Sequence, residues 1–215
     1  MIFSTIDVKP LFPTPFVKAS LDDEISIELN RQLVALILKK AQESRGVFIS
    51  NSRGWQSDDK LIEWGGESVQ VILGALRELL NQITMCVDGE QFRRVALDWR
   101  VNGWANINYE CSSNVPHVHP GAYWSAVYYV STDAIDTKDE EGGELELFDP
   151  RGVLPIHYGP SLRFGVQDYA SAGTSQLHKP KPGQCVVFPS WLKHAVKSFT
   201  GGGARISLAF NFSIK

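Results

Sequence analysis

The sequence predicts an α+β fold in which helices pack on one face of a β-sandwich or jelly roll. Three observations lead to this class. Apolar residues recur at helical spacing in the first part of the chain, and the period changes to two from about residue 92. Turn-forming Pro and Gly residues then separate several short segments of alternating character.

The first part of the chain is expected to form two amphipathic helices. Regularly spaced Leu and Ile residues predict helices over about residues 23–44 and 67–86, and Ser20 to Asp23 resembles a capping box at the start of the first helix. Each helix has one apolar face that another layer must cover. We therefore interpret residues 1–91 as mainly helical support and residues 92–215 as the jelly-roll core of a single domain.

The second part reads as short strands separated by turns such as Gly142-Gly143 and Pro182-Gly183. Alternation of apolar and polar residues is the pattern of a strand with one buried face. The predicted strands are Trp104 to Glu110, Ser125 to Ser131, Glu144 to Phe148, Gln184 to Phe188 and Arg205 to Ser213.

Composition excludes several classes of protein. The chain has 215 residues, 43% of them hydrophobic, which suffices for one sizeable core and is short for two domains. It has no apolar run of about 18 residues, so no membrane span is expected. The formal net charge of -3 argues against a nucleic-acid partner. The 3 scattered cysteines and the absence of a signal-like N-terminus favour a cytoplasmic protein.

The 5 histidines all lie between residues 117 and 194, which places any metal chemistry in the second half. On a strand, His117 and His119 would present two imidazoles to one face, about 6 to 7 Å apart. Two surface histidines in a Pro-flanked turn are the alternative. His157 and His178 lie in a Pro- and Gly-rich insertion and are interpreted as surface or loop residues.

A charged residue stands on the last predicted strand. Arg205 and Ser207 alternate with apolar residues, and an unpaired buried charge is costly, so Arg205 needs a partner. That partner is either an Asp or Glu of the chain or the carboxylate of a ligand, which a planar guanidinium fits well. Asn106 and Asn108 share a strand face and are expected either to line a pocket or to hydrogen-bond within the barrel.

Taken together, His-x-His, the distal His194 and Arg205-x-Ser207 resemble the 2-oxoglutarate/Fe(II) oxygenases. The resemblance implies Fe(II) on His117, His119 and His194, with 2-oxoglutarate as cosubstrate. It also implies that Arg205 and Ser207 hold the far carboxylate of 2-oxoglutarate. The stretches around Tyr129 and Gly142-Gly143 resemble the prolyl-hydroxylase branch, in which the equivalent of Tyr129 hydrogen-bonds that carboxylate. Ser125 and Asn108 are further candidates for cosubstrate binding, Ser125 because it shares the strand face of Tyr129.

The chain is still more similar to a family of short bacterial and phage oxygenases of this superfamily. That similarity implies a double-stranded β-helix with helices flanking one sheet, and hydroxylation of an unidentified substrate. The shared motifs are Leu11 to Pro15, Gly54 to Ser57, Trp104 to Asn108, His117 to Pro120, Ser125 to Val130 with Ala126 in place of Gly, Asp149 to Arg151, Phe188 to His194 and Arg205 to Asn211.

One departure leaves the metal site open to interpretation. His119 occupies the position where the wider superfamily has a carboxylate. Either three histidines bind the metal, a set also compatible with zinc, or Glu144 or Glu146 supplies a carboxylate. Two other functions remain as alternatives, a cupin-like metalloprotein without 2-oxoglutarate and a non-catalytic metal-binding protein. The expected partners are a small-molecule or peptide substrate and, through an exposed edge of the smaller sheet, a second copy in a homodimer.

Overall fold

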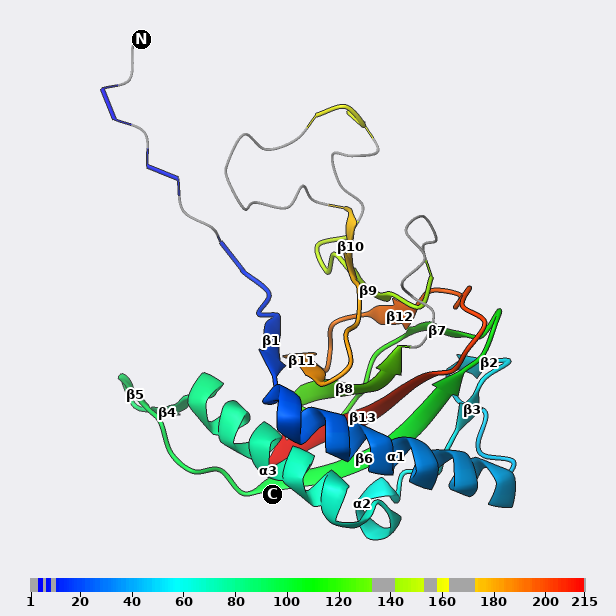
Figure 1. Ribbon diagram of the computed structural model, residues 1–215. Helices are drawn as coiled ribbons and strands as arrows, with labels where there is room; N and C mark the ends of the chain where they lie inside the picture. The colour runs from blue at the N-terminus through cyan, green and yellow to red at the C-terminus, as the bar shows by residue number, and fades with distance from the viewer. Residues whose placement is uncertain are drawn as a thin grey trace.

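Two antiparallel sheets form a double-stranded β-helix in the computed structural model, which describes residues 4–5, 7–8, 11–132, 142–152, 158–162 and 173–214. Among these residues the larger sheet has the strand order β1-β11-β8-β13-β6-β3 and the smaller sheet the order β10-β9-β12-β7-β2 (Figure 1). The strands of the larger sheet are β1 (Val17–Ser20), β11 (Gln184–Pro189), β8 (Trp124–Thr132), β13 (Arg205–Ile214), β6 (Trp99–Asn108) and β3 (Trp55–Gln56). Those of the smaller sheet are β10 (Ser175–His178), β9 (Leu145–Phe148), β12 (His194–Val196), β7 (Ser113–His117) and β2 (Asn51–Ser52).

Three helices lie before β6 in the chain, and a separate hairpin follows the last of them. They are α1 (Asp23–Glu43), α2 (Leu61–Trp64) and α3 (Gly66–Ile83), with the hairpin formed by β4 (Cys86–Asp88) and β5 (Gln91–Arg93). Asp22, not Ser20, caps α1, because its carboxylate accepts hydrogen bonds from the backbone N–H groups of Glu24 and Ile25. Ser20 instead ends β1.

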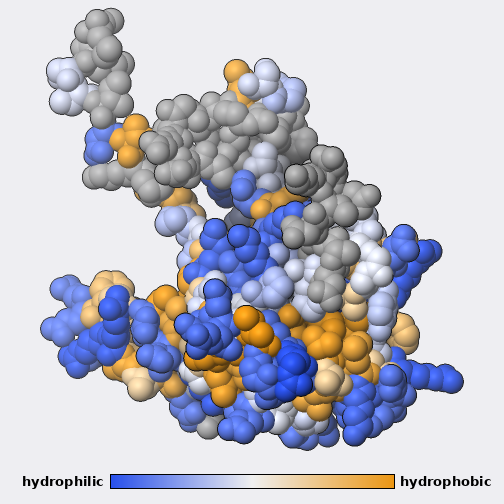
Figure 2. Space-filling view, viewed as in Figure 1, coloured by the Kyte–Doolittle hydropathy of each residue, from blue (hydrophilic) through white to orange (hydrophobic). Residues whose placement is uncertain are grey.

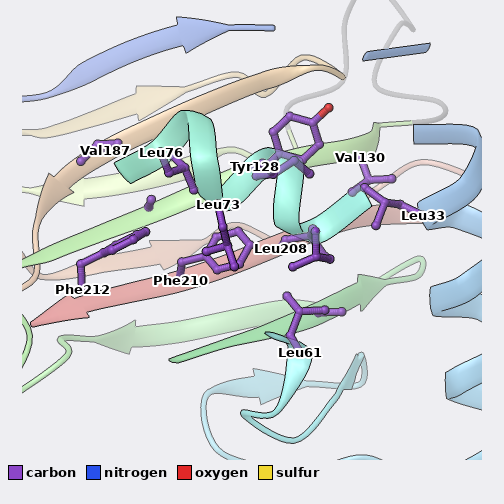
Figure 3. Packing of buried hydrophobic residues seen from close by; sticks show 14 of the residues in the cluster. Leu33, Leu61, Leu73, Leu76, Tyr128, Val130, Val187, Leu208, Phe210 and Phe212 are labelled. Atoms are coloured by element: carbon purple, nitrogen blue, oxygen red, sulfur yellow. The ribbon is translucent and has the colours of Figure 1, made fainter. Parts of the chain in front are cut away.

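The helices cover the outer face of the larger sheet, as the sequence predicts. Leu73 of α3 points toward Phe210 of β13, and Leu76 of α3 lies near Val187 of β11 (Figure 3). Leu33 of α1 and Leu208 of β13 belong to the same apolar cluster. These side chains are all at most 2% exposed. Burying each one contributes about 1.5–3 kcal/mol, so this layer is the main apolar core.

The alternation of β13 decides what faces the space between the sheets. Its even-numbered apolar residues pack on the helices, so Arg205, Ser207, Ala209 and Asn211 point inward, between the two sheets. A smaller apolar cluster fills the rest of that space and consists of Tyr129, Leu145, Leu147, Val186, Phe188 and Leu192. The interior therefore has one apolar part and one polar part.

Several elements differ from those expected. The second long helix ends at Ile83 because Thr84 is extended. β7 and β10 are strands without a clear alternating pattern, and β1 alternates but is only 4 residues long. His178 lies at the end of β10 and is half-buried, so its interpretation as a surface or loop residue is wrong. His157 lies outside the described residues.

No helix in the described part of the chain is long and apolar enough to cross a membrane. The face that carries α1 and α3 mixes hydrophobic with hydrophilic residues (Figure 2).

Candidate metal centre

Three histidines converge at one point between the sheets. His117 ends β7, His194 begins β12, and the antiparallel register places them directly opposite each other. The ring centres of His117 and His194 are 4.4 Å apart, and His119 lies 4.9 and 5.0 Å from these two rings. One ligand nitrogen from each residue lies within 4.8 Å of the other two. Within the described ranges, this is the one group of at least three metal-ligating side chains.

The His-x-His pair reaches this geometry differently from the way expected. β7 ends at His117, so the two residues are not on one strand, and His119 lies in the following turn. The backbone N–H of His119 donates to the carbonyl of Ser190 at 3.0 Å, and this bond anchors the turn to the loop before β12. Backbone hydrogen bonding, not strand alternation, therefore brings His119 to the site.

Hydrogen bonds to backbone carbonyls orient two of the imidazoles. His117 Nδ1 lies 2.7 Å from the carbonyl of Val115, and His194 Nδ1 lies 2.8 Å from the carbonyl of Leu192. A carbonyl only accepts, so each Nδ1 carries the proton and each Nε2 presents a lone pair. This is the arrangement in which histidine binds a metal through Nε2.

Burial keeps these histidines neutral. Desolvation lowers the pKa of His194 to about 3 and that of His119 to about 4, and it also lowers the pKa of His117. The cluster therefore offers three unprotonated nitrogens at neutral pH. A metal ion needs ligands in that state, so the donor set fits Fe(II) or Zn(II).

Neither glutamate considered as a metal ligand joins the histidines. Glu144 is buried, and its Oε1 accepts a hydrogen bond from the backbone N–H of Gly142 at 2.8 Å. Glu146 Oε1 accepts from the hydroxyl of Ser175 at 2.6 Å. The geometry thus gives no support to a carboxylate from either residue at the metal.

Arg205 is buried in the same interior, only 1% exposed. Its Nε donates to the carbonyl of Gly143 at 2.9 Å, and its Nη1 donates to Asn108 Oδ1 at 3.0 Å and to Ser207 Oγ at 3.4 Å. Its Cζ lies 5.4 Å from the centre of the Tyr129 ring. In the part of the chain that the structure describes, no carboxylate forms an ion pair with it within 4.0 Å. An internal salt bridge, one of the two expectations for Arg205, is therefore not seen.

A hollow of about 40 Å³ connects the two groups of residues. All three histidines line it, and so does Arg205. Tyr129 is fully buried beside it, and desolvation raises the pKa of its hydroxyl to about 12. That hydroxyl makes no hydrogen bond of good geometry to a described residue, but it is close enough to Arg205 to interact with the guanidinium. Ser125 also lines the hollow, where its hydroxyl donates to Asn211 Oδ1 at 2.8 Å.

The structure brings together every site residue expected from the sequence and adds two. The backbone carbonyl of Gly143 holds Arg205, and Asn114 accepts a hydrogen bond from the Asn108 amide at 3.3 Å. The sequence marked Gly143 as a turn residue and as part of a stretch that resembles the prolyl-hydroxylase branch, but not as a partner of Arg205. A carbonyl contact leaves no side-chain signal by which it could be found.

Comparison with known proteins agrees with this fold. Residues 102–211 match the family described as "Putative 2OG-Fe(II) oxygenase". No curated protein sequence matches the chain. Among solved structures, a Pseudomonas putida prolyl-4-hydroxylase is similar with a TM-score of 0.59 and 16% identity, covering 94% of both chains.

Two other solved structures share the fold at low sequence identity. One is a prolyl hydroxylase from Trichoplax adhaerens in complex with a hypoxia inducible factor peptide fragment, with a TM-score of 0.60 and 13% identity over 93% of this chain and 83% of that one. The other is the α-ketoglutarate-dependent epimerase SnoN from nogalamycin biosynthesis, with a TM-score of 0.60 and 14% identity over 94% and 79%. The family match spans half of the chain and includes all three histidines and Arg205, so the protein belongs to the 2-oxoglutarate/Fe(II) oxygenases, which are oxidoreductases.

Proposed function

We propose that the protein is a hydroxylase that binds Fe(II) through His117, His119 and His194 and uses 2-oxoglutarate as cosubstrate. The observation that carries this proposal is Arg205. It is a buried guanidinium that forms no ion pair within 4.0 Å with a carboxylate of the described chain, and it lines the same hollow as three neutral, convergent imidazoles. A buried charge of this kind is stable only with a partner, and a dicarboxylate bound at the metal supplies one.

The protein's contribution is to hold and orient the cosubstrate. The guanidinium of Arg205 is planar and suits bidentate contact with the distal carboxylate. Tyr129 stays protonated at neutral pH, so its hydroxyl can donate to that carboxylate. Ser207 lies beside Arg205 Nη1 and can add a third hydroxyl contact. When bound, iron and 2-oxoglutarate supply O₂-dependent oxidation of a substrate C–H bond, with release of succinate and CO₂.

Three neutral histidines leave the full charge of the metal uncompensated by the protein. A set of two histidines and one carboxylate would offset one unit of that charge. The three-histidine set therefore favours binding of a dianion such as 2-oxoglutarate. The ring of Phe188 packs 4.8 Å from that of His194, and the apolar cluster around Phe188 limits the access of water to this side of the site.

The substrate is proposed to be a peptide or a small molecule. Two of the three histidines are only half-buried, so the site opens to the surface. Trp104 lies there, with its ring 5.4 Å from that of His119. One structural neighbour binds a peptide and another belongs to the biosynthesis of a small molecule, so the fold accepts both kinds of substrate.

Anaerobic titration of the Fe(II)-loaded protein with 2-oxoglutarate tests the proposal. We expect a weak metal-to-ligand charge-transfer band in the visible, and succinate once O₂ and a substrate are admitted. Arg205→Ala should raise the Kd for 2-oxoglutarate by about 100-fold or more, because it removes the charged partner of the distal carboxylate. An absent band, together with an unchanged Kd in Arg205→Ala, would eliminate 2-oxoglutarate as cosubstrate and favour a cupin-like or non-catalytic metal protein.

A further inference from the structure

His178 stands directly behind the proposed cosubstrate pocket. Its ring centre lies 5.9 Å from that of Tyr129, with an angle of 36° between the planes. On its other side, its ring meets that of Phe16 edge to face at 5.5 Å. Tyr129 thus contacts both Arg205 and His178.

Ring contacts help to hold Tyr129 in position. Its buried hydroxyl interacts with the guanidinium of Arg205, and the side chain of Gln184 interacts with the imidazole of His178. The phenol ring is also held by the groups that touch it, and His178 is one of them.

A wide groove lies next to His178. It has a volume of about 450 Å³ and lies between the segment that leads into β1 and the strands β9 and β10. His178 lines the groove, whereas Tyr129 lines the hollow that holds Arg205 and the three histidines. β1 and β10 are edge strands of the two sheets, and residues of both line the groove. The groove therefore lies at the seam between the sheets.

We propose that His178 is a positioning residue that fixes Tyr129 and thereby sets the length of 2-oxo acid that the pocket accepts. This inference rests on the proposed function, because it concerns the residue that would meet the distal carboxylate. With the imidazole in place, Tyr129 cannot move toward the groove. Without it, the phenol ring can shift into the space left behind and the pocket lengthens.

The prediction concerns selectivity between two dicarboxylates that differ by one methylene, 2-oxoglutarate and 2-oxoadipate. One methylene in a closed pocket changes binding by about 10- to 200-fold. We expect the wild-type protein to prefer 2-oxoglutarate. In His178→Ala, the ratio of the two Kd values should fall by about 10-fold, through weaker 2-oxoglutarate binding and stronger 2-oxoadipate binding.

The experiment is an anaerobic titration of Fe(II)-loaded wild type and variants with each acid, followed by the charge-transfer band. His178→Phe keeps a flat ring behind Tyr129, so it should retain the preference of the wild type within about twofold. Leu177→Ala removes the neighbouring side chain on the same strand and should leave the ratio unchanged. If His178→Ala does not fold, as judged by thermal melting, His178→Asn replaces it in the same measurement.

The outcomes separate the two proposals. Binding of neither acid to the wild type would overturn the proposed function itself. If the wild type prefers 2-oxoglutarate but folded His178→Ala has the same ratio, His178 is only a packing residue and this inference is wrong. A ratio that falls equally in Leu177→Ala would also overturn it, because the effect would then come from loosening of β10 as a whole.

Discussion

The side-chain oxygen of Asn108 accepts a hydrogen bond from the buried guanidinium of Arg205 at 3.0 Å. Asn108 is itself fixed, because its amide donates to Asn114 at 3.3 Å. Asparagine is a neutral partner, so it orients Arg205 without neutralising its charge. The charge remains available for a ligand carboxylate.

Replacing this neutral partner by a charged one should block the cosubstrate. In Asn108→Asp, Arg205 gains an internal carboxylate at hydrogen-bond distance, and the Kd for 2-oxoglutarate should rise by about 10-fold or more. Thermal stability should not fall, since the new charge is paired. The matched variant Asn108→Ala removes the acceptor without adding a charge and should have a smaller effect on Kd. A stronger effect in the Ala variant than in the Asp variant would contradict this explanation.

The ligand set can be tested by metal content. His194→Ala should lower bound iron by about 10-fold or more under limiting metal, since three protein ligands become two. Glu144→Ala and Glu146→Ala should retain iron at the level of the wild type, because neither carboxylate joins the histidine cluster. The measurement is iron per chain by elemental analysis after desalting. Loss of iron in Glu144→Ala would show instead that a carboxylate completes the site.

Gly143 connects backbone conformation to the binding of the cosubstrate. Its φ of +72° is a conformation that residues with a Cβ rarely adopt. An added Cβ would also lie 3.1 Å from Cδ of Arg205, whose Nε donates to the carbonyl of Gly143. Gly143→Ala should therefore lower stability by about 1 kcal/mol and weaken 2-oxoglutarate binding together.

A control separates the two effects of Gly143→Ala. Gly89 also has a positive φ, of +61°, but a Cβ added there would meet no described atom within 4 Å, so Gly89→Ala should carry the strain alone. Chemical denaturation and cosubstrate titration of both variants make the comparison. Equal changes in Kd for the two would mean that Arg205 is not displaced in Gly143→Ala.

The sequence predicts those parts of the fold and site that depend on local spacing of apolar residues. The helix expected over 23–44 is observed as Asp23–Glu43, and the alternation after Arg205 correctly separates core residues from inward-facing ones. β7 and β10 carry no comparable signal, since their burial is set by the strands beside them. The position of His119 depends on one backbone bond to Ser190, and the role of His178 on a ring contact with Tyr129. Such contacts link residues far apart in the chain and produce no repeating pattern in the sequence.

Stability of the metal-free protein should fall as the pH decreases from 7.5 to about 5. Burial lowers the pKa of His194 to about 3 and that of His119 to about 4, and it also lowers those of His117 and His178, whereas an exposed histidine titrates near 6.5. Between these values the unfolded chain binds more protons than the folded chain, so the free energy of unfolding decreases with falling pH. The lowered pKa values of Glu28 and Asp149 act in the same direction, but only below about pH 5, where carboxylates titrate.

The histidine contribution can be isolated with a single variant. His194→Gln removes the most buried of the three ligands, so its melting temperature after chelator treatment should depend less steeply on pH over the same interval. Thermal melts of both proteins at several pH values make the measurement. Saturating metal should steepen the dependence of the wild type, because protons then compete with the metal for the same nitrogens. Parallel curves for the chelated wild type and His194→Gln would mean that burial of these histidines does not control acid sensitivity.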